Sequence, residues 1–77
     1  MKEQYLLEKR KELVEAMKAN GSIETKSVEA AFLKVKRENF VPAHLEKEAY
    51  ENTSLPIGFS QTISQPSTIA IMLEMLE

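Results

Sequence analysis

One stretch, Leu55 to Pro66, separates two parts of the chain that favour helix. It reads Leu-Pro-Ile-Gly-Phe-Ser-Gln-Thr-Ile-Ser-Gln-Pro, whereas the sequence before it is rich in Lys and Glu and the sequence after it is apolar. Pro56 fixes one backbone angle and Gly58 permits angles that a side chain would forbid, so residues 55–59 are predicted to form a shaped loop. Because helix-forming sequence stops here, we expect the functional site to lie within this stretch.

The segment from Lys2 to about Ala19 is predicted to form one amphipathic helix. Its apolar side chains recur at helical spacing, while Glu and Lys cover the remaining surface. Asn20 and Gly21 both tolerate the left-handed conformation that ends helices, so the helix is expected to stop there. The predicted buried face consists of Leu6, Leu13, Val14 and Met17.

Two shorter helices are predicted between this segment and the loop. Ser27 can cap the first of them. Pro42 suits the first turn of the second, which runs to Tyr50, because the first turn of a helix leaves its N–H groups unpaired and a proline has none. Phe40 and Val41, just before that proline, are expected to fill the core. The buried face of the first of these helices is predicted to consist of Val28, Ala31, Phe32 and Val35.

A last helix follows the loop, with Ser64 predicted as its N-cap and Pro66 in its first turn. The free N–H groups and the positive dipole end of a helix start favour a carboxylate or a phosphate. The hydroxyls of Thr62 and Ser64 would add two hydrogen-bonding groups beside such an anion. The simpler alternative, that Ser64 only caps the helix, stays open on residue types alone.

Composition argues against several classes of function. The chain has 77 residues, enough for one small domain, and a net charge of -2 with acidic and basic residues interspersed. A nucleic-acid partner would require clustered Lys and Arg, and a membrane-binding helix would require cations to dominate its polar face, so neither is expected. No metal site is expected, because Cys is absent and the single histidine, His44, lacks further ligands at suitable spacing. The absence of Cys is compatible with a reducing cytoplasm, the expected compartment.

Three short motifs follow one another in the second half of the chain. Val35 to Pro42 reads Val-Lys-Arg-Glu-Asn-Phe-Val-Pro, Ala49 and Tyr50 come next, and Leu-Pro-Ile-Gly with Gln-Thr-Ile-Ser-Gln-Pro lies in the loop. Together they resemble the protein-L-isoaspartate O-methyltransferase family, whose substrate-binding loop the third motif matches. Lys36 replaces a proline of the family's first motif, which is expected to let the helix run slightly further, and Ser60 stands where many members have Gly. Arg37 is expected to form a structural ion pair.

The resemblance implies a mainly α fold of about four helices. Residues 1–77 would be an N-terminal lobe that carries the loop 55–66 and packs, in the family, on a Rossmann-like α/β domain that binds S-adenosylmethionine. This chain has no Gly-rich turn for that cofactor, so the cofactor domain is expected to be absent and the chain alone inactive. The last helix would then keep apolar surface, and self-association through Ile69 to Leu76 is expected.

The same resemblance implies the chemistry of the site. In the family, the free carboxylate of an isoaspartyl residue in a damaged protein attacks the methyl group of S-adenosylmethionine. Ser64 and Thr62 match the family's active-site hydroxyls and would orient that carboxylate. The substrate pocket would be shaped by Ile57, Gly58 and Ile63, and the methyl donor would lie against Gln61, Thr62, Ile63 and Ser64.

Two other functions stay open. One is the substrate lobe of a related methyltransferase that esterifies aspartates of a peptide. The other is a non-catalytic helical module in which Ile69 to Leu76 docks a partner helix and the loop is only a connector.

Overall fold

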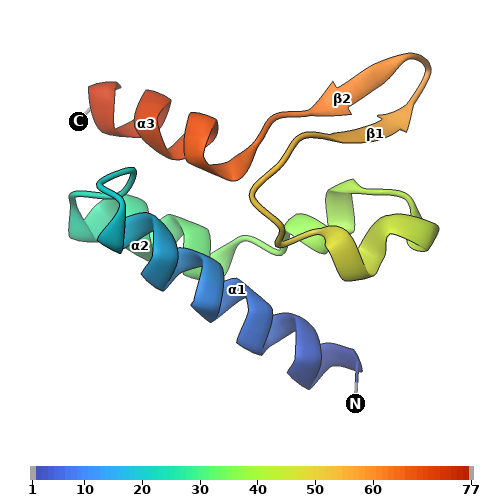
Figure 1. Cartoon of the computed structure of the whole chain (residues 1–77), viewed down its shortest axis with the longest axis horizontal. Helices are drawn as coiled ribbons and strands as arrows, with labels where there is room; N and C mark the ends of the chain where they lie inside the picture. The colour runs from blue at the N-terminus through green and yellow to red at the C-terminus, as the bar shows by residue number, and fades with distance from the viewer. Residues whose placement is uncertain (1, 77) are drawn as a thin grey trace.

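The computed structural model describes residues 2–76. Within them, helix α2 contacts both α1 and α3, and a β-hairpin between the short helix η2 and α3 projects away from the helices (Figure 1). The predicted mainly α fold with about four helices is confirmed. The elements in chain order are α1 (Lys2–Ala19), α2 (Lys26–Lys34), the 3-10 helices η1 (Arg37–Phe40) and η2 (Ala43–Glu48), β1 (Leu55–Gly58), β2 (Gln61–Ile63) and α3 (Pro66–Leu76).

Helix α1 has the predicted bounds and the predicted buried face. Gly21 ends it with a positive φ of 87°, and the Asn20 side chain accepts a hydrogen bond from the backbone N–H of Ser22 at 2.9 Å. Arg10 also lies on the buried face and is only 7% exposed. The core therefore contains a charged group, which must be paired to be stable there. Its apolar part is formed by Leu6, Leu13, Val14, Met17, Ile23, Val28, Ala49, Tyr50 and Ala70.

Helix α2 begins two residues earlier than expected. Its N-cap is Thr25, whose hydroxyl oxygen accepts a hydrogen bond from the Val28 N–H at 3.3 Å, and the predicted cap Ser27 lies inside the helix. A contact from α3 fixes this start, because the Glu74 carboxylate accepts hydrogen bonds from the N–H groups of Glu24 and Thr25 at 2.7 and 2.8 Å. Thr25 rather than Ser27 is therefore the cap because Glu74, far along the chain, binds the backbone at Thr25.

This contact predicts a pH-dependent stability. The pKa of Glu74 lies below its ordinary value, chiefly because the Thr25 N–H donates to the carboxylate, while partial burial opposes the shift. A depressed folded-state pKa stabilises the fold above the ordinary value, and that stability is lost as the pH falls through the folded-state pKa. We expect the urea midpoint of the unaltered chain to fall between about pH 5 and pH 3 more steeply than that of Glu74→Gln. Parallel pH profiles of the two proteins would contradict this.

The segment after α2 differs from the expectation. Helix α2 stops at Lys34 rather than running on, and the extra 3-10 helix η1 follows it; the predicted short third helix is present as the 3-10 helix η2. Phe40 is 59% exposed and does not fill the core, whereas Val41 packs against it from a partly buried position. The buried side chains here are instead those of Arg37, in η1, and Tyr50, whose hydroxyl accepts a hydrogen bond from the Arg37 N–H. Of the predicted α2 face, only Val28 is fully buried.

The predicted loop is a short antiparallel hairpin. Leu55 pairs with Ile63, Pro56 with Thr62 and Gly58 with Gln61. Ile57 has no partner in this register, so it forms a β-bulge, which bends the strand and redirects its side chain. The connecting residues Phe59 and Ser60 have φ of 54° and 59°, as a two-residue type I′ turn requires.

The turn gives a physical reason for the glycine that the resemblance implies at position 60 in many members of the family. Ser60 adopts a left-handed conformation that costs a non-glycine residue about 1 kcal/mol. We expect Ser60→Gly to raise the population of the closed hairpin and the stability of the chain by up to about 1 kcal/mol, measured by NMR and urea unfolding. Ser60→Ala, which retains the strain, should leave both unchanged. An equal gain from both substitutions would contradict this explanation.

Candidate functional site

The six residues predicted for the site lie on the hairpin and its exit. Ile57 and Gly58 belong to β1, the segment Gln61–Ile63 forms β2, and Ser64 follows directly. Side chains alternate along a strand, so those of Gln61 and Ile63 lie on one side of β2 and that of Thr62 on the other. Apart from the half-buried Ile63, these residues are exposed. The hairpin therefore brings all of them together on an accessible arm (Figure 1).

Ser64 is not the cap of α3, contrary to expectation. Pro66 is the first helical residue, so the cap position falls on Gln65, whose carbonyl accepts from the Ile69 N–H at 3.2 Å. The side-chain cap comes from Asn52, whose Oδ1 accepts from the Ser67 N–H at 3.0 Å and whose Nδ2 donates to the Ser67 hydroxyl at 2.6 Å. The predicted anion site at the helix start is thus weakened, because Pro66 has no N–H and that of Ser67 is occupied.

This capping arrangement leaves the site hydroxyls available. Within residues 2–76, the side chains of Ser64 and Thr62 make no hydrogen bond. Both residues are exposed. A hydroxyl can donate one hydrogen bond and accept others, so this pair could hold a carboxylate oxygen. Ser64 is free for that task because Asn52 caps the helix in its place.

Arg37 does not form the expected ion pair. It is 7% exposed, and no carboxylate of residues 2–76 lies within ion-pair distance of it. Its Nε donates to the Ala49 carbonyl at 2.6 Å, and its Nη2 donates to the carbonyls of Thr53 at 3.2 Å and Ser64 at 2.9 Å. Burial lowers the pKa of Arg37, although arginine stays protonated in proteins. The guanidinium therefore binds the chain just before and just after the hairpin.

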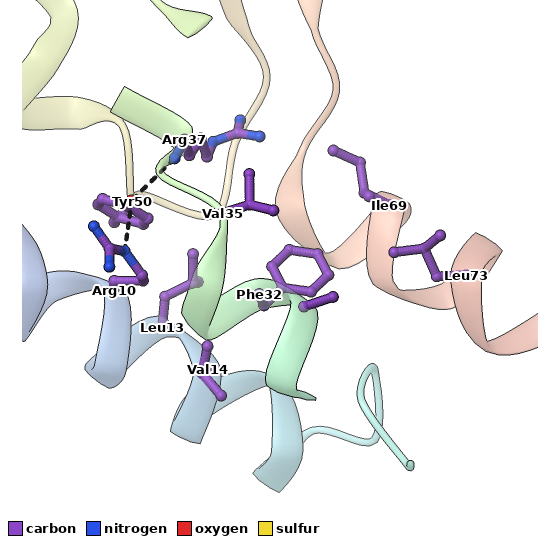
Figure 2. A pocket seen from close by; sticks show the side chains of 10 residues that line it. Arg10, Leu13, Val14, Phe32, Val35, Arg37, Tyr50, Ile69 and Leu73 are labelled. Atoms are coloured by element: carbon purple, nitrogen blue, oxygen red, sulfur yellow. Dashed lines mark hydrogen bonds between the residues drawn. The ribbon is translucent and has the colours of Figure 1, made fainter. Parts of the chain in front are cut away.

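The neighbouring carboxylate, Glu38, pairs with Arg10 instead. Their side chains are 10% and 8% exposed, and Arg10 Nη2 lies 3.3 Å from Glu38 Oε2. The Tyr50 hydroxyl accepts from Arg10 Nε at 2.8 Å and from the Arg37 N–H at 3.0 Å (Figure 2). It donates to Glu38. Burial and then the bond to Glu38 raise the pKa of Tyr50. Arg10 lies four residues after Leu6 and three before Leu13, so helical spacing could have identified it as a residue of the buried face. No feature of the neighbouring sequence indicated that its partners would be Tyr50 and Glu38.

An apolar cavity of about 150 Å³ opens between α1, α2 and α3 (Figure 2). Phe32 and Val35 face Ile69 and Leu73 across it, which explains why the predicted face of α2 remains partly accessible. Its walls are almost wholly apolar, with Arg10 and Tyr50 at one end. The cavity is separate from the hydroxyl groups of the hairpin.

The part of the chain that the structure describes carries neither a metal-binding cluster nor a membrane-spanning helix. His44 is exposed on η2, and no group of three or more His, Cys, Asp or Glu side chains in residues 2–76 could hold a metal ion. No helix there is both long and apolar enough to span a bilayer.

Comparison with known proteins gives a consistent result. The family model of protein-L-isoaspartate(D-aspartate) O-methyltransferase matches residues 8–77. The chain is 50% identical over 70 residues to the protein-L-isoaspartate O-methyltransferase of Ignicoccus hospitalis, covering 91% of the chain and 33% of that protein. It is 47% identical over 77 residues to that of Pyrococcus horikoshii, covering 100% of the chain and 35% of the relative. The chain thus spans about a third of the length of the curated relatives it matches.

Proposed function

Because the chain belongs to the protein-L-isoaspartate(D-aspartate) O-methyltransferase family, we propose that it forms the substrate-side lobe of a protein-repair methyltransferase. The enzyme would transfer a methyl group from S-adenosylmethionine to the free carboxylate of isoaspartyl residues in damaged proteins. The observation that carries this proposal is the pair of unengaged hydroxyls, Thr62 and Ser64, on an exposed hairpin whose base is anchored in the core.

The proposed task of the hairpin is alignment. An acceptor carboxylate is itself the nucleophile in this reaction, so the protein needs no catalytic nucleophile of its own. Ser64 and Thr62 would donate hydrogen bonds that orient the carboxylate oxygens without protonating them. Holding the reacting atoms at near-attack distance supplies a large part of the rate enhancement of such a displacement. The isoaspartyl carboxylate loses its negative charge as the methyl ester forms.

The apolar residues of the hairpin would form the substrate pocket. Ile57 is 37% exposed and sits at the bulge, so its side chain is available to a ligand. Gly58, next to it, has a φ of 101° and no atom within 4 Å of the place where a Cβ would be, which leaves room for a close approach by a peptide backbone. Ile63 would complete the wall. These three residues would distinguish the kinked isoaspartyl backbone from an ordinary aspartyl one.

S-adenosylmethionine supplies an electrophilic methyl group when bound. Polar side chains at Gln61, Thr62 and Ser64 are exposed and chemically suited to contact it. The two glycines of the chain, Gly21 and Gly58, lie apart and form no Gly-rich turn. Most cofactor contacts would therefore come from a Rossmann-like domain outside these residues, and we expect this chain alone to be inactive.

Helix α3 would join the lobe to that domain. Ile71, Met72, Met75 and Leu76 are 49%, 59%, 79% and 82% exposed, which is more apolar surface than a solvent-facing helix usually presents. This surface would pack on the α/β domain in the complete enzyme. In the isolated chain it would promote self-association, which sedimentation velocity can measure.

The test is methyl transfer by the complete gene product that contains this chain. Labelled S-adenosylmethionine is supplied with an isoaspartyl peptide or with its aspartyl twin, and the isolated chain serves as the control. Label on the isoaspartyl peptide alone supports the repair function. Label on the aspartyl peptide would instead indicate a related peptide-aspartate methyltransferase. A folded product that binds the cofactor but labels neither peptide would exclude both.

A matched pair of serine substitutions tests the assignment of the site. Ser64→Ala should lower kcat for the isoaspartyl peptide by about 10- to 100-fold, as removal of an orienting group does. Ser54→Ala, an exposed serine just before β1, should leave kcat unchanged. Circular dichroism checks that both variants fold. Full activity of Ser64→Ala would exclude Ser64 from the site.

A further inference from the structure

One buried side chain holds both ends of the hairpin. Among the described residues, Arg37 alone donates hydrogen bonds to the chain before β1, at Thr53, and after β2, at Ser64. We propose that Arg37 is a positioning residue of the site, fixing the peptide group of Ser64 so that the Ser64 side chain meets the acceptor carboxylate in a productive orientation. This inference rests on the function proposed above. It adds to the proposed site a residue, Arg37, whose side chain is buried.

The geometry of the guanidinium suits this role. Its planar fork presents several N–H groups in fixed directions, so one group can bind three carbonyls at once. Nε holds the Ala49 carbonyl at 2.6 Å, and Ala49 is 0% exposed, so this end of the fork is attached to the core. A lysine, with one nitrogen on a flexible stem, could not span the same three acceptors.

The main chain of Arg37 is itself anchored. Its N–H donates to the Tyr50 hydroxyl, which also binds Glu38 and Arg10. The backbone of Arg37 is therefore held at Tyr50, while its side chain is held at Ala49 (Figure 2 shows the bond between Arg37 and Tyr50). A carbonyl held by a guanidinium anchored in this way fixes the orientation of its own peptide plane, and the adjoining residue follows because a peptide unit is planar.

Little else holds the hairpin against the helices. Of residues 55–63, only Leu55 is buried, and Phe59 at the tip is fully exposed. Asn52 also bridges the base of the hairpin, but its hydrogen bonds to Ser67 on α3 are exposed, whereas those of Arg37 are buried or partly buried. Without Arg37, the hairpin would keep the pairing between β1 and β2 but lose its fixed position relative to the core.

The experiment compares two buried arginines. Arg37→Lys and Arg10→Lys both keep the charge and lose the fork, and the two residues are equally buried at 7% exposure. In the complete gene product that contains this chain, at a temperature where both variants are folded, we expect Arg37→Lys to lower kcat on the isoaspartyl peptide by about 10- to 100-fold. The KM for S-adenosylmethionine should stay unchanged, and Arg10→Lys should keep kcat within about 3-fold, below the smallest loss expected at Arg37.

A second readout is independent of the activity. In the isolated chain, backbone NMR order parameters of residues 55–64 should fall from about 0.85 to below about 0.6 in Arg37→Lys and stay high in Arg10→Lys. Equal losses in both variants, or no loss in either, would overturn the proposal. If the unaltered enzyme labels no isoaspartyl peptide, the proposed function fails, and the order parameters still decide whether Arg37 holds the arm.

Folding failure is also covered. If Arg37→Lys does not fold at any temperature, the proposal is tested by measuring the hairpin order parameters of the unaltered chain. Hairpin order parameters below about 0.6 despite a slowly exchanging Arg37 Nε–H would overturn the proposal, because a bound Arg37 would then not immobilise the arm. Values near about 0.85 would support it.

Discussion

Replacing Glu38 by Gln is expected to unfold most of the isolated chain. Glu38 is the only carboxylate among residues 2–76 that pairs with the buried Arg10, and it also accepts from Tyr50. Gln keeps the size of the side chain but removes its charge, leaving a buried guanidinium uncompensated. Breaking such a pair costs about 3 to 5 kcal/mol. A domain of this size gains only about 3 to 5 kcal/mol from its core, so the loss should consume nearly all its stability.

A second ion pair offers a matched control for this change. Glu29 lies 3.0 Å from Lys18, but the two side chains are 26% and 40% exposed. Glu29→Gln should therefore cost less than about 1 kcal/mol. Urea unfolding followed by circular dichroism would compare the two variants. Equal midpoints for Glu38→Gln and Glu29→Gln would show that burial of the Arg10 pair does not matter to the fold.

Truncating Met17 should be almost as severe. Its side chain is 0% exposed at the end of α1 and is among the largest fully buried side chains. Met17→Ala removes buried apolar atoms and leaves a cavity, a combination that costs about 2 to 5 kcal/mol. Thermal unfolding should show a large drop in the midpoint or no cooperative transition at all.

Met72 provides the same substitution at an accessible position. It is 59% exposed on α3 and makes no part of the apolar core cluster. Because alanine favours helix at least as well as methionine, Met72→Ala should change the stability by less than about 0.5 kcal/mol. A loss comparable to that of Met17→Ala would mean that the outer face of α3 is covered in solution.

Local signals in the sequence predicted the parts of the fold that depend on neighbouring residues. The apolar spacing of α1 and the glycine after it gave the helix its correct bounds and face. Pro66 was correctly placed in the first turn of α3, since a proline there is a strong local signal, although the helix begins at Pro66 itself rather than one residue earlier. The predicted site residues in 55–66 also lie close together in space, because a hairpin keeps residues that are close in sequence close in space.

The errors concern contacts made across the chain. Thr25 displaced Ser27 as a cap because Glu74, 49 residues further on, binds its N–H. Asn52 displaced Ser64 in the same manner, from 15 residues away. Arg37 was expected to pair with a charge, but the nearby carboxylate was already engaged by Arg10. Hydrogen-bond partners of this kind are chosen by packing, and no spacing rule in the sequence encodes them.

Two sets of hydrogen bonds close the base of the hairpin, so the sequence of the hairpin can vary independently of the packing of the helices. Arg37 joins Thr53 to Ser64, and Asn52 joins the preceding loop to α3, so the ends of the arm are fixed from outside the arm itself. Lengthening a loop between fixed ends changes the closure entropy only slowly. The residues between those ends can therefore diverge, by substitution or insertion, while the helices keep their packing. In evolutionary terms, the sequence of the hairpin can change without endangering the fold.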